Sequence, residues 1–266
     1  MSEPSIEASQ AAPCPAGPPP APGEPVSFQQ KLINTATSAL QSFYPIGKIC
    51  QHVCAFHCYA HDTTRQVHAH HFCSHLNEEM RQCIIYDSDK PGARLIGIEY
   101  IITRRLYEDL PQEERRFWHS HQYEVSSGQL AALDVPLAAA NLDASKLVDT
   151  YGKTFHTWQV DLGHELPYGP PQLMMSFTAD GQLDPALQQQ RDDMHGISSE
   201  EIRNSRSGML DGLQPPHPAA DHPWRTGRAW TTSMQLQDAK LAGSKQVAAA
   251  EAAKHGGAAL STQQRA

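Results

Sequence analysis

The sequence predicts an α+β protein with a mostly antiparallel sheet and an N-terminal helical pair, flanked by disordered tails. Helical apolar spacing dominates the chain before about residue 62, and period-two segments with inserted helices follow it. Proline, alanine and glycine are concentrated towards the ends, where bulky apolar residues are scarce. We therefore expect a disordered Pro/Ala-rich arm at 1–26, a folded domain at 27–211 and a flexible Ala-rich tail at 212–266.

The first predicted helix runs from Phe28 to Tyr44, and its apolar residues fall on one face at helical spacing. The opposite face carries Gln, Asn, Thr and Ser, with Lys31 as its only charge. Packing on the sheet is the commoner arrangement for such a helix. The alternative is a lipid-packing sensor that lies in a membrane interface, and it gains weight here because the helix borders a disordered arm. The expected lipid-contacting residues are Phe28, Leu32, Leu40 and Phe43.

The second helix of the pair is predicted from Lys48 to Asp62, where Cys50, Cys54 and Cys58 form a stripe beside apolar residues. In a helix, Cys50 and Cys58 lie about 12 Å apart along the axis. Thiolates on one zinc lie within about 4.6 Å of each other, so the three cannot share a metal. We expect them to pack as small apolar side chains, with palmitoylation of an exposed one as the alternative.

Strand-like segments follow from Arg65, and two helix signals interrupt them. The expected strands are 65–75, 81–88, 93–103, 154–163 and 172–178, and the expected helices are 111–118 and 137–152.

Charge and segment hydropathy exclude several classes of function. The net charge of −8 gives no basic surface for nucleic acid. The longest apolar segments, such as 95–102, fall short of the roughly 20 residues that cross a bilayer, so no transmembrane insertion is expected. Residues 1–25 have no secretory pattern, and the six cysteines are expected to be reduced thiols in the cytosol. Cys73 and Cys83 face each other in the predicted hairpin, but a disulfide is unusual in that compartment.

Histidine is the residue type that most suggests chemistry, with fifteen in the chain. Alternation on a strand places His71, Cys73 and His75 on one face, and an extended segment would do the same for His119 and His121. The candidate metal ligands are His71, His75, His119 and His121, with Glu99 or Glu124 as a carboxylate and zinc or iron as the ion. The pattern loosely resembles a metal-binding cupin strand, with Glu124 out of register. The favoured alternative is that these histidines form hydrogen bonds within a half-buried sheet, because no metal motif of fixed spacing is present.

Enzyme motifs are scarce. The sequence has no nucleophile elbow, phosphate loop or dinucleotide fingerprint. We expect no organic cofactor and assign no catalytic residue.

Long stretches of the chain resemble one known family. The first stretch is AHHFCSHLNEEMRQCIIYDSDKPGARLIGIEYIITRRLYEDLPQEERRFWHSHQYEV, and YGKTFHTWQVDLGHELPYGPPQLMMS and RDDMH follow it. Together they are similar to the oil body-associated protein family (DUF1264) over roughly residues 52–193.

The resemblance implies a non-enzymatic protein at the surface of lipid droplets and in the cytosol, contributing to droplet size and stability. Droplet lipid or droplet proteins would be its partners. Unlike oleosins, this chain has no long apolar hairpin, so the resemblance implies peripheral association. A metal-binding protein or metal-dependent enzyme built on the histidines is the alternative.

Overall fold

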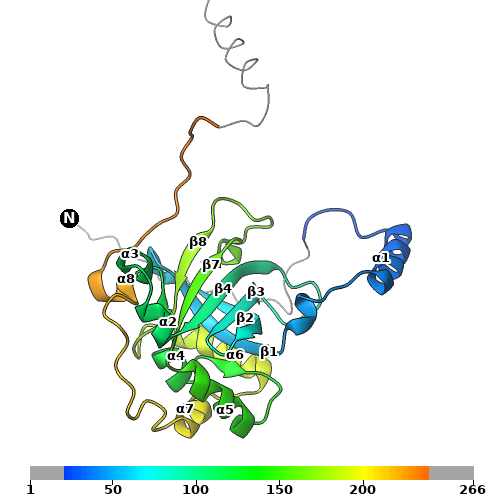
Figure 1. Cartoon of the computed structure of the whole chain (residues 1–266). Coiled ribbons are helices and arrows are strands. Elements are labelled where there is room, and N and C mark those ends of the chain that lie inside the picture. The colour runs from blue at the N-terminus through cyan, green and yellow to red at the C-terminus, as the bar shows by residue number, and fades with distance from the viewer. Residues whose placement is uncertain (1–20, 240–266) are drawn as a thin grey trace, which may run out of the picture. The chain divides into compact units, whose positions relative to one another are not determined.

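A computed structural model describes residues 21–239, and its centre is a closed six-stranded antiparallel barrel (Figure 1). The barrel strands are β1 (Gln51–Tyr59), β2 (Asp62–Asn77), β3 (Met80–Tyr86), β4 (Leu95–Thr103), β7 (Thr150–His156) and β8 (Gln172–Met175). They pair in the order β1–β2–β3–β4–β7–β8, and β8 pairs with β1 to close the ring. Two short strands, β5 (His119–Ser120) and β6 (Ala131–Ala132), add to β7 and β1. The predicted α+β class with an antiparallel sheet is therefore confirmed.

The predicted helical pair is not found, because its second member is strand β1. Every residue of β1 from Val53 to Tyr59 is buried, so both faces of the strand are covered. Val53 and Ala55 pack in one apolar cluster, whereas Phe56 and Cys58 pack in another. A strand buried on both faces lacks the polar–apolar alternation that identifies a strand, and its apolar run resembles that of a buried helix.

The first predicted helix is present as α1 (Phe28–Leu40), followed by the short 3₁₀ helix η1 (Ile46–Lys48). It begins at Ser27, whose side chain accepts a hydrogen bond from the Gln30 amide at 3.1 Å. It ends where Gln41 takes an extended conformation, so it is shorter than predicted. Within the described residues, no side chain of α1 is buried.

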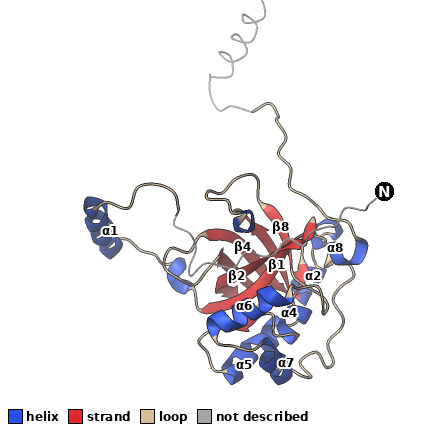
Figure 2. Ribbon diagram, turned by 180° about the vertical axis from the view of Figure 1, so that it is seen from behind, coloured by secondary structure: helices blue, strands red, loops and turns tan. Residues whose placement is uncertain are grey.

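The remaining helices surround the barrel. They are α2 (Arg104–Glu108), α3 (Gln112–Arg115), α4 (Gln122–Ser126), α5 (Leu137–Leu147), η2 (Val160–Leu162), α6 (Pro185–His195), α7 (Ser199–Ser205) and α8 (His222–Thr226). Figure 2 shows α6 lying across the outside of the strands, where Arg191 reaches the sulfur of Cys54 at 3.5 Å. The helices expected at 111–118 and 137–152 correspond to α3 and α5, although β7 takes the residues from Thr150 onward.

The inward-facing residues of the barrel form layers. On β1, Val53 and Ala55 belong to an apolar cluster near α5, and Tyr59 belongs to a second apolar cluster near η2. His57 lies between them on the same face, since side chains alternate along a strand. On β2, His71 also points inward, and its Nε2 lies 3.3 Å from His57 Nε2, although the register pairs His71 with Val53. A polar layer is thereby enclosed between two apolar layers.

The antiparallel register also brings Cys73 opposite Cys83, and the two form a disulfide with their Cα atoms 4.0 Å apart. This contradicts the expectation of reduced thiols throughout. Cys54 and Cys58 are buried free thiols, which confirms that they pack as small apolar side chains, while Cys50 is exposed.

The segment beyond residue 212, predicted as a flexible tail, is attached to the barrel in its first part. The Asp221 carboxylate accepts hydrogen bonds from the amide and the hydroxyl of Ser120, both at 2.7 Å. Trp224 donates to the carbonyl of Ser176 at 2.8 Å. The compact unit containing the barrel accordingly runs to Thr232. Residues 1–20 of the predicted arm and 240–266 of the predicted tail lie outside the described residues.

From residue 21 to residue 239, no helix has both the length and the apolar composition needed to cross a membrane.

Candidate functional site

The polar layer of the barrel is centred on the carboxylate of Glu99, which comes from β4 and is 4% exposed. Its Oε1 lies 3.3 Å from His119 Nε2 and 3.5 Å from His121 Nε2. Its Oε2 lies 3.3 Å from His71 Nε2. All three histidines are buried, so one carboxylate faces three imidazoles without bulk water between them.

Further polar groups surround this centre. His57 Nε2 lies 3.3 Å from His71 Nε2, and His57 Nδ1 lies 3.0 Å from His156 Nε2. The hydroxyl of Thr154 donates to Glu99 Oε1 at 2.9 Å. Among the described residues, neither ring nitrogen of His119 has a hydrogen-bond partner of good geometry, and the same holds for His71 Nδ1. Buried polar groups are nearly always satisfied, so these unpaired nitrogens are candidate positions for a water molecule or a ligand.

The backbone of Gly152 makes room for the cluster. Gly152 on β7 pairs with His119 on β5, directly beneath the ligand atoms. A Cβ at this position would collide with Glu99 Oε1 and lie 2.6 Å from His121 Nε2 and 2.7 Å from His119 Nε2. The point where these three atoms converge is therefore open only because residue 152 has no side chain.

Burial shifts the pKa values of the ionisable side chains in this cluster. It lowers the pKa of His57 well below its usual value, with the charges of His71 and His156 adding to the effect. Burial also lowers the pKa of His71, against the opposing charge of Glu99. For Glu99, burial alone would raise the pKa, but the neighbouring imidazoles of His119, His121 and His71 outweigh it and hold the pKa well below its usual value. The lowered pKa values favour the neutral forms of His57 and His71 and the ionised form of Glu99, which are the forms in which these side chains bind a metal.

Glu124, the second acid of the polar layer, differs from Glu99 in the direction of its pKa shift. Its Oε1 lies 3.6 Å from His121 Nε2, and its Oε2 accepts a hydrogen bond from Ser176 at 2.6 Å. Burial raises the pKa of Glu124 to about 7, with the charge of His119 opposing and that of Glu99 adding to the rise. A carboxyl group that exchanges its proton near neutral pH has the property required of a general acid or base.

The donor set fits a transition metal. Two groups of three side chains each offer ligand atoms within 4.8 Å of one another, and Glu99 belongs to both. They are His57–His71–Glu99 and Glu99–His119–His121. Donors on a tetrahedral zinc lie about 3.4 Å apart, given metal–ligand bonds of about 2.0–2.1 Å. The N···O distances of 3.3 and 3.5 Å around Glu99 are close to this value, and two histidines with one carboxylate also suit non-haem iron.

The structure brings together three of the four histidines that the sequence proposes as ligands. His71, His119 and His121 surround Glu99, and both candidate acids are in the same layer. His75 is exposed near the end of β2 and does not join them. His119 and His121 converge although the segment is not extended throughout, since α4 begins directly after His121.

His57 and His156 are members of the cluster that the sequence analysis missed. The sequence did not indicate His57 as a member of the cluster, because residues 48–62 were predicted as a helix. A period-two interpretation of this segment would have placed His57 on one face of a strand with Val53 and Ala55.

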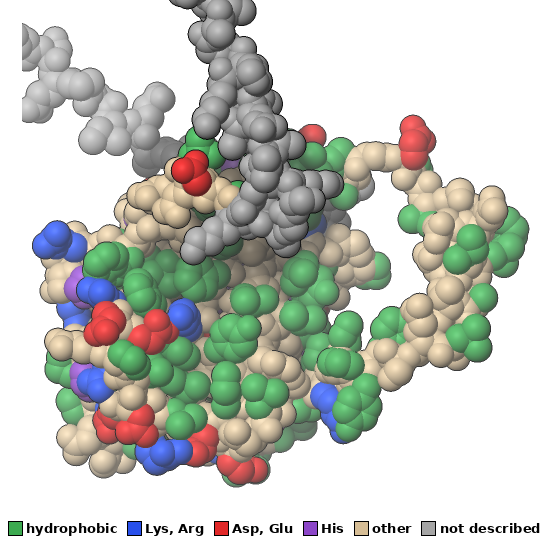
Figure 3. All heavy atoms as spheres, turned by 45° about the horizontal axis from the view of Figure 1, so that its top comes forward, with side chains coloured by type: hydrophobic (Ala, Val, Ile, Leu, Met, Phe, Trp, Pro, Cys, Tyr) green, Lys and Arg blue, Asp and Glu red, His purple; other side chains and the backbone are tan. Residues whose placement is uncertain are grey.

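The predicted lipid-contacting residues lie at and beyond α1. Phe28, Leu32 and Leu40 are 76%, 57% and 87% exposed, and Phe43, which follows the helix, is 50% exposed. Figure 3 shows hydrophobic side chains projecting from this helix, which bears little charge.

The sequence profile of the family described as "Protein of unknown function (DUF1264)" matches residues 43–210. "Oil body-associated protein 1B" of Arabidopsis thaliana is 52% identical over 203 residues, which are 76% of this chain and 84% of the relative. The chain belongs to the oil body-associated protein family. "Oil body-associated protein 1A" of Zea mays is 44% identical over 217 residues, covering 82% of this chain and 90% of the relative. "Oil body-associated protein 2A" of Zea mays is 42% identical over 204 residues, covering 76% and 79%. No solved structure matches the chain.

Proposed function

We propose that this protein associates peripherally with lipid droplets by inserting the apolar face of α1 between surface phospholipids. The names of its relatives place them at oil bodies. The observation that supports the proposal in this chain is the exposure of the large apolar side chains at Phe28, Leu32 and Leu40. A helix that buries none of its residues in the described protein leaves this face free for a partner.

The geometry of the helix separates the two faces. At about 100° per residue, Phe28, Leu32, Ala36 and Leu40 lie within one arc, and Gln30, Asn34 and Ser38 lie opposite. Removing a Leu or Phe side chain from water contributes roughly 1.5–3 kcal/mol. Three such side chains contribute roughly 4.5–9 kcal/mol, which is similar to the free-energy cost of association, so we expect binding through α1 to be weak and reversible.

The charge of the protein suits a droplet coat. Lys31 is the only charged residue in α1, so attraction to anionic headgroups contributes little. The chain as a whole carries a net charge of −8. Proteins anchored through α1 would repel one another and resist droplet fusion, which would limit droplet size and stabilise the droplets. Droplet proteins are the alternative partners for the same apolar face.

Flotation with purified droplets or phospholipid-coated triglyceride emulsions tests the proposal. The variant Leu32→Asp/Leu40→Asp is expected to lose at least tenfold in binding, because two charges would enter the apolar interface. The matched control is Asn34→Asp/Ser38→Asp, which adds the same charge to the polar face and should bind normally. Equal binding of wild type and the leucine variant would refute the role of α1.

A second candidate function is metal binding in the barrel, and it rests on the convergence of ligand atoms from Glu99, His119 and His121, which lie within 4.8 Å of one another. We infer that Glu99, His119 and His121 hold zinc or iron, with His71 and His57 adjacent. Such an ion would supply Lewis-acid chemistry beside Glu124, which can hold or release a proton at its carboxyl group near pH 7. A small pocket lined by His57, His71, Glu99, His121 and Glu124 extends to Arg81 and Asp143.

Elemental analysis of protein purified without chelators tests this second function. Near-stoichiometric zinc or iron is expected in wild type, and His119→Ala should remove it. His75→Ala is the matched control, because His75 lies on a neighbouring strand but is exposed. Wild-type protein without bound metal would leave the cluster as a hydrogen-bonded network.

A further inference from the structure

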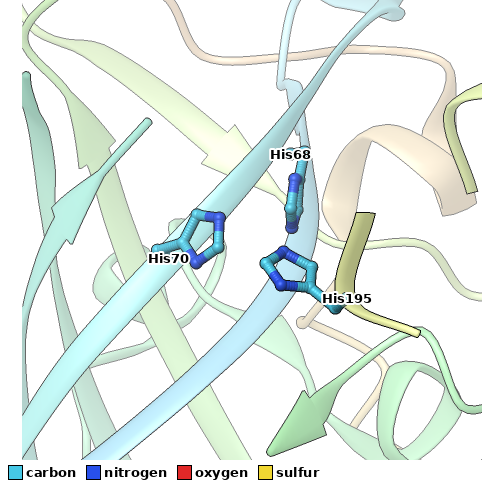
Figure 4. A group of neighbouring side chains, drawn as sticks. All are labelled: His68, His70 and His195. Atoms are coloured by element: carbon cyan, nitrogen blue, oxygen red, sulfur yellow. The ribbon is translucent and has the colours of Figure 1, made fainter. Parts of the chain in front are cut away.

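Three other histidines meet on the outside of the barrel wall. His68 and His70 lie on the same face of β2, and His195 is the last residue of α6, which covers that face (Figure 4). The ring centroids are 4.6 Å apart for His68 and His70, 5.7 Å for His68 and His195, and 5.3 Å for His70 and His195. Three imidazoles from two separate elements therefore share one small space.

Each of the three rings has an unsatisfied nitrogen. The Nε2 atoms of His68, His70 and His195 are buried and have no hydrogen-bond partner among residues 21–239. His70 is only 1% exposed. Each ring offers one ligand nitrogen, and the three nitrogens lie within 4.8 Å of one another. Leaving three such atoms unpaired costs free energy, and a shared ligand that accepts three nitrogen donors would recover it.

The opposite nitrogen of His70 has a hydrogen-bond partner, as is usual for histidines that bind metals, and that of His195 faces a carboxylate beyond hydrogen-bond distance. His70 Nδ1 lies 3.1 Å from His52 Nε2, which orients the ring. His195 Nδ1 faces Asp89 Oδ2 at 4.0 Å. The nearby cations are compensated, because Lys90 Nζ lies 3.3 Å from Asp89 and the buried Arg191 is paired with Asp192 at 2.7 Å.

We propose that His68, His70 and His195 form a binding site for a divalent transition metal of the zinc class. Three histidine nitrogens are a common protein donor set for zinc and leave a fourth position for water. To reach the spacing of about 3.4 Å on a tetrahedral ion, the rings must close by about 1 Å. His195 can provide this movement because it ends its helix, followed by Gly196 in the left-handed conformation.

This site is independent of the one in the barrel. His70 and His71 are adjacent in sequence, but alternation along β2 sends them to opposite sides of the wall. His71 faces Glu99 in the interior, whereas His70 faces α6. An ion bound outside would fasten α6 to β2, and so it would add a link between helix and barrel that the interior ion does not make.

Equilibrium dialysis of metal-free, full-length protein against Zn²⁺, followed by elemental analysis, tests the proposal. His195→Ala and His68→Ala should each bind one zinc equivalent less than wild type, and each should lose part of the rise in melting temperature that zinc gives. Two controls apply: His75→Ala, an exposed histidine of the same strand, and Glu99→Gln, which alters only the interior site. His75→Ala should match wild type, and His195→Ala combined with Glu99→Gln should bind less zinc than Glu99→Gln alone.

Melting of the metal-free variants shows whether they fold, and either outer-site variant that folds serves for the comparison. Equal zinc content in wild type, His195→Ala and His68→Ala would overturn the outer site, whatever the result at Glu99. An equal loss in His75→Ala would also overturn it, because binding would then be unspecific surface attachment.

Discussion

The barrel interior buries polar and charged side chains, whereas α1 exposes large apolar side chains to solvent. Both regions depart from the usual distribution of side chains in a folded protein. The barrel buries Glu99 together with histidines such as His71 and His119, all at most 4% exposed. Helix α1 leaves Phe28 and Leu40 more than three-quarters exposed. Each arrangement costs free energy on its own, the first through desolvation of polar groups and the second through hydration of apolar ones. In both regions a partner would offset this cost: one that compensates buried polar groups in the barrel, and one that removes the apolar surface of α1 from water.

The largest expected effect comes from removing the carboxylate at the centre of the polar layer. Glu99→Ala leaves His71, His119 and His121 facing one another without their shared acceptor. The free energy of unfolding should fall by about 3–5 kcal/mol, as for other broken buried pairs. Urea unfolding followed by circular dichroism measures it. Glu165→Ala, at an exposed loop position, is the control and should leave stability unchanged.

Filling the space above Gly152 should have the next largest effect. Gly152→Ala introduces a Cβ among the ligand atoms of Glu99, His119 and His121. Overpacking of this kind lowers the free energy of unfolding by about 1–3 kcal/mol, and it should also reduce zinc or iron content. Gly47→Ala is the matched control, since a Cβ there meets no atom within 4 Å. Normal stability in Gly152→Ala would mean that the cluster rearranges freely.

On the side of α1, charge substitutions should change binding without changing stability. Leu32→Asp/Leu40→Asp should shift the free energy of unfolding by less than about 0.5 kcal/mol, because both side chains are exposed. Chemical denaturation of wild type and variant gives the comparison. A clear loss of stability would show instead that this face packs on the protein itself.

The smallest expected effect is that of salt on droplet binding. Raising the ionic strength from about 0.01 to about 0.15 M shortens the screening length from roughly 30 to 8 Å. Since Lys31 is the only charge in α1, the bound fraction should change by less than about twofold, as expected for apolar insertion. Flotation at the two salt concentrations, with Lys31→Ala as a control, measures this. A strong decrease with salt would point to recognition of anionic headgroups.

Particular residues show how far the sequence alone determined the site. His71, His119 and His121 were identified from residue type and spacing, and Glu99 and Glu124 as their acids. His57 was missed because β1 is buried on both faces, which hides the period of two. His195 could not be linked to His68 and His70, since nothing local indicates that α6 crosses the outside of β2.

The sequence by itself determined the family, a helix that begins at Phe28 and most strands, because these depend on motifs and local periodicity. Only the tertiary structure decided that the sheet closes, that Cys73 and Cys83 form a disulfide, and that Glu99, His119 and His121 crowd against the backbone of Gly152. The physical reason is register: the position of each side chain in a barrel depends on pairing between strands far apart in the chain. That pairing places Glu99 among histidines from three other segments.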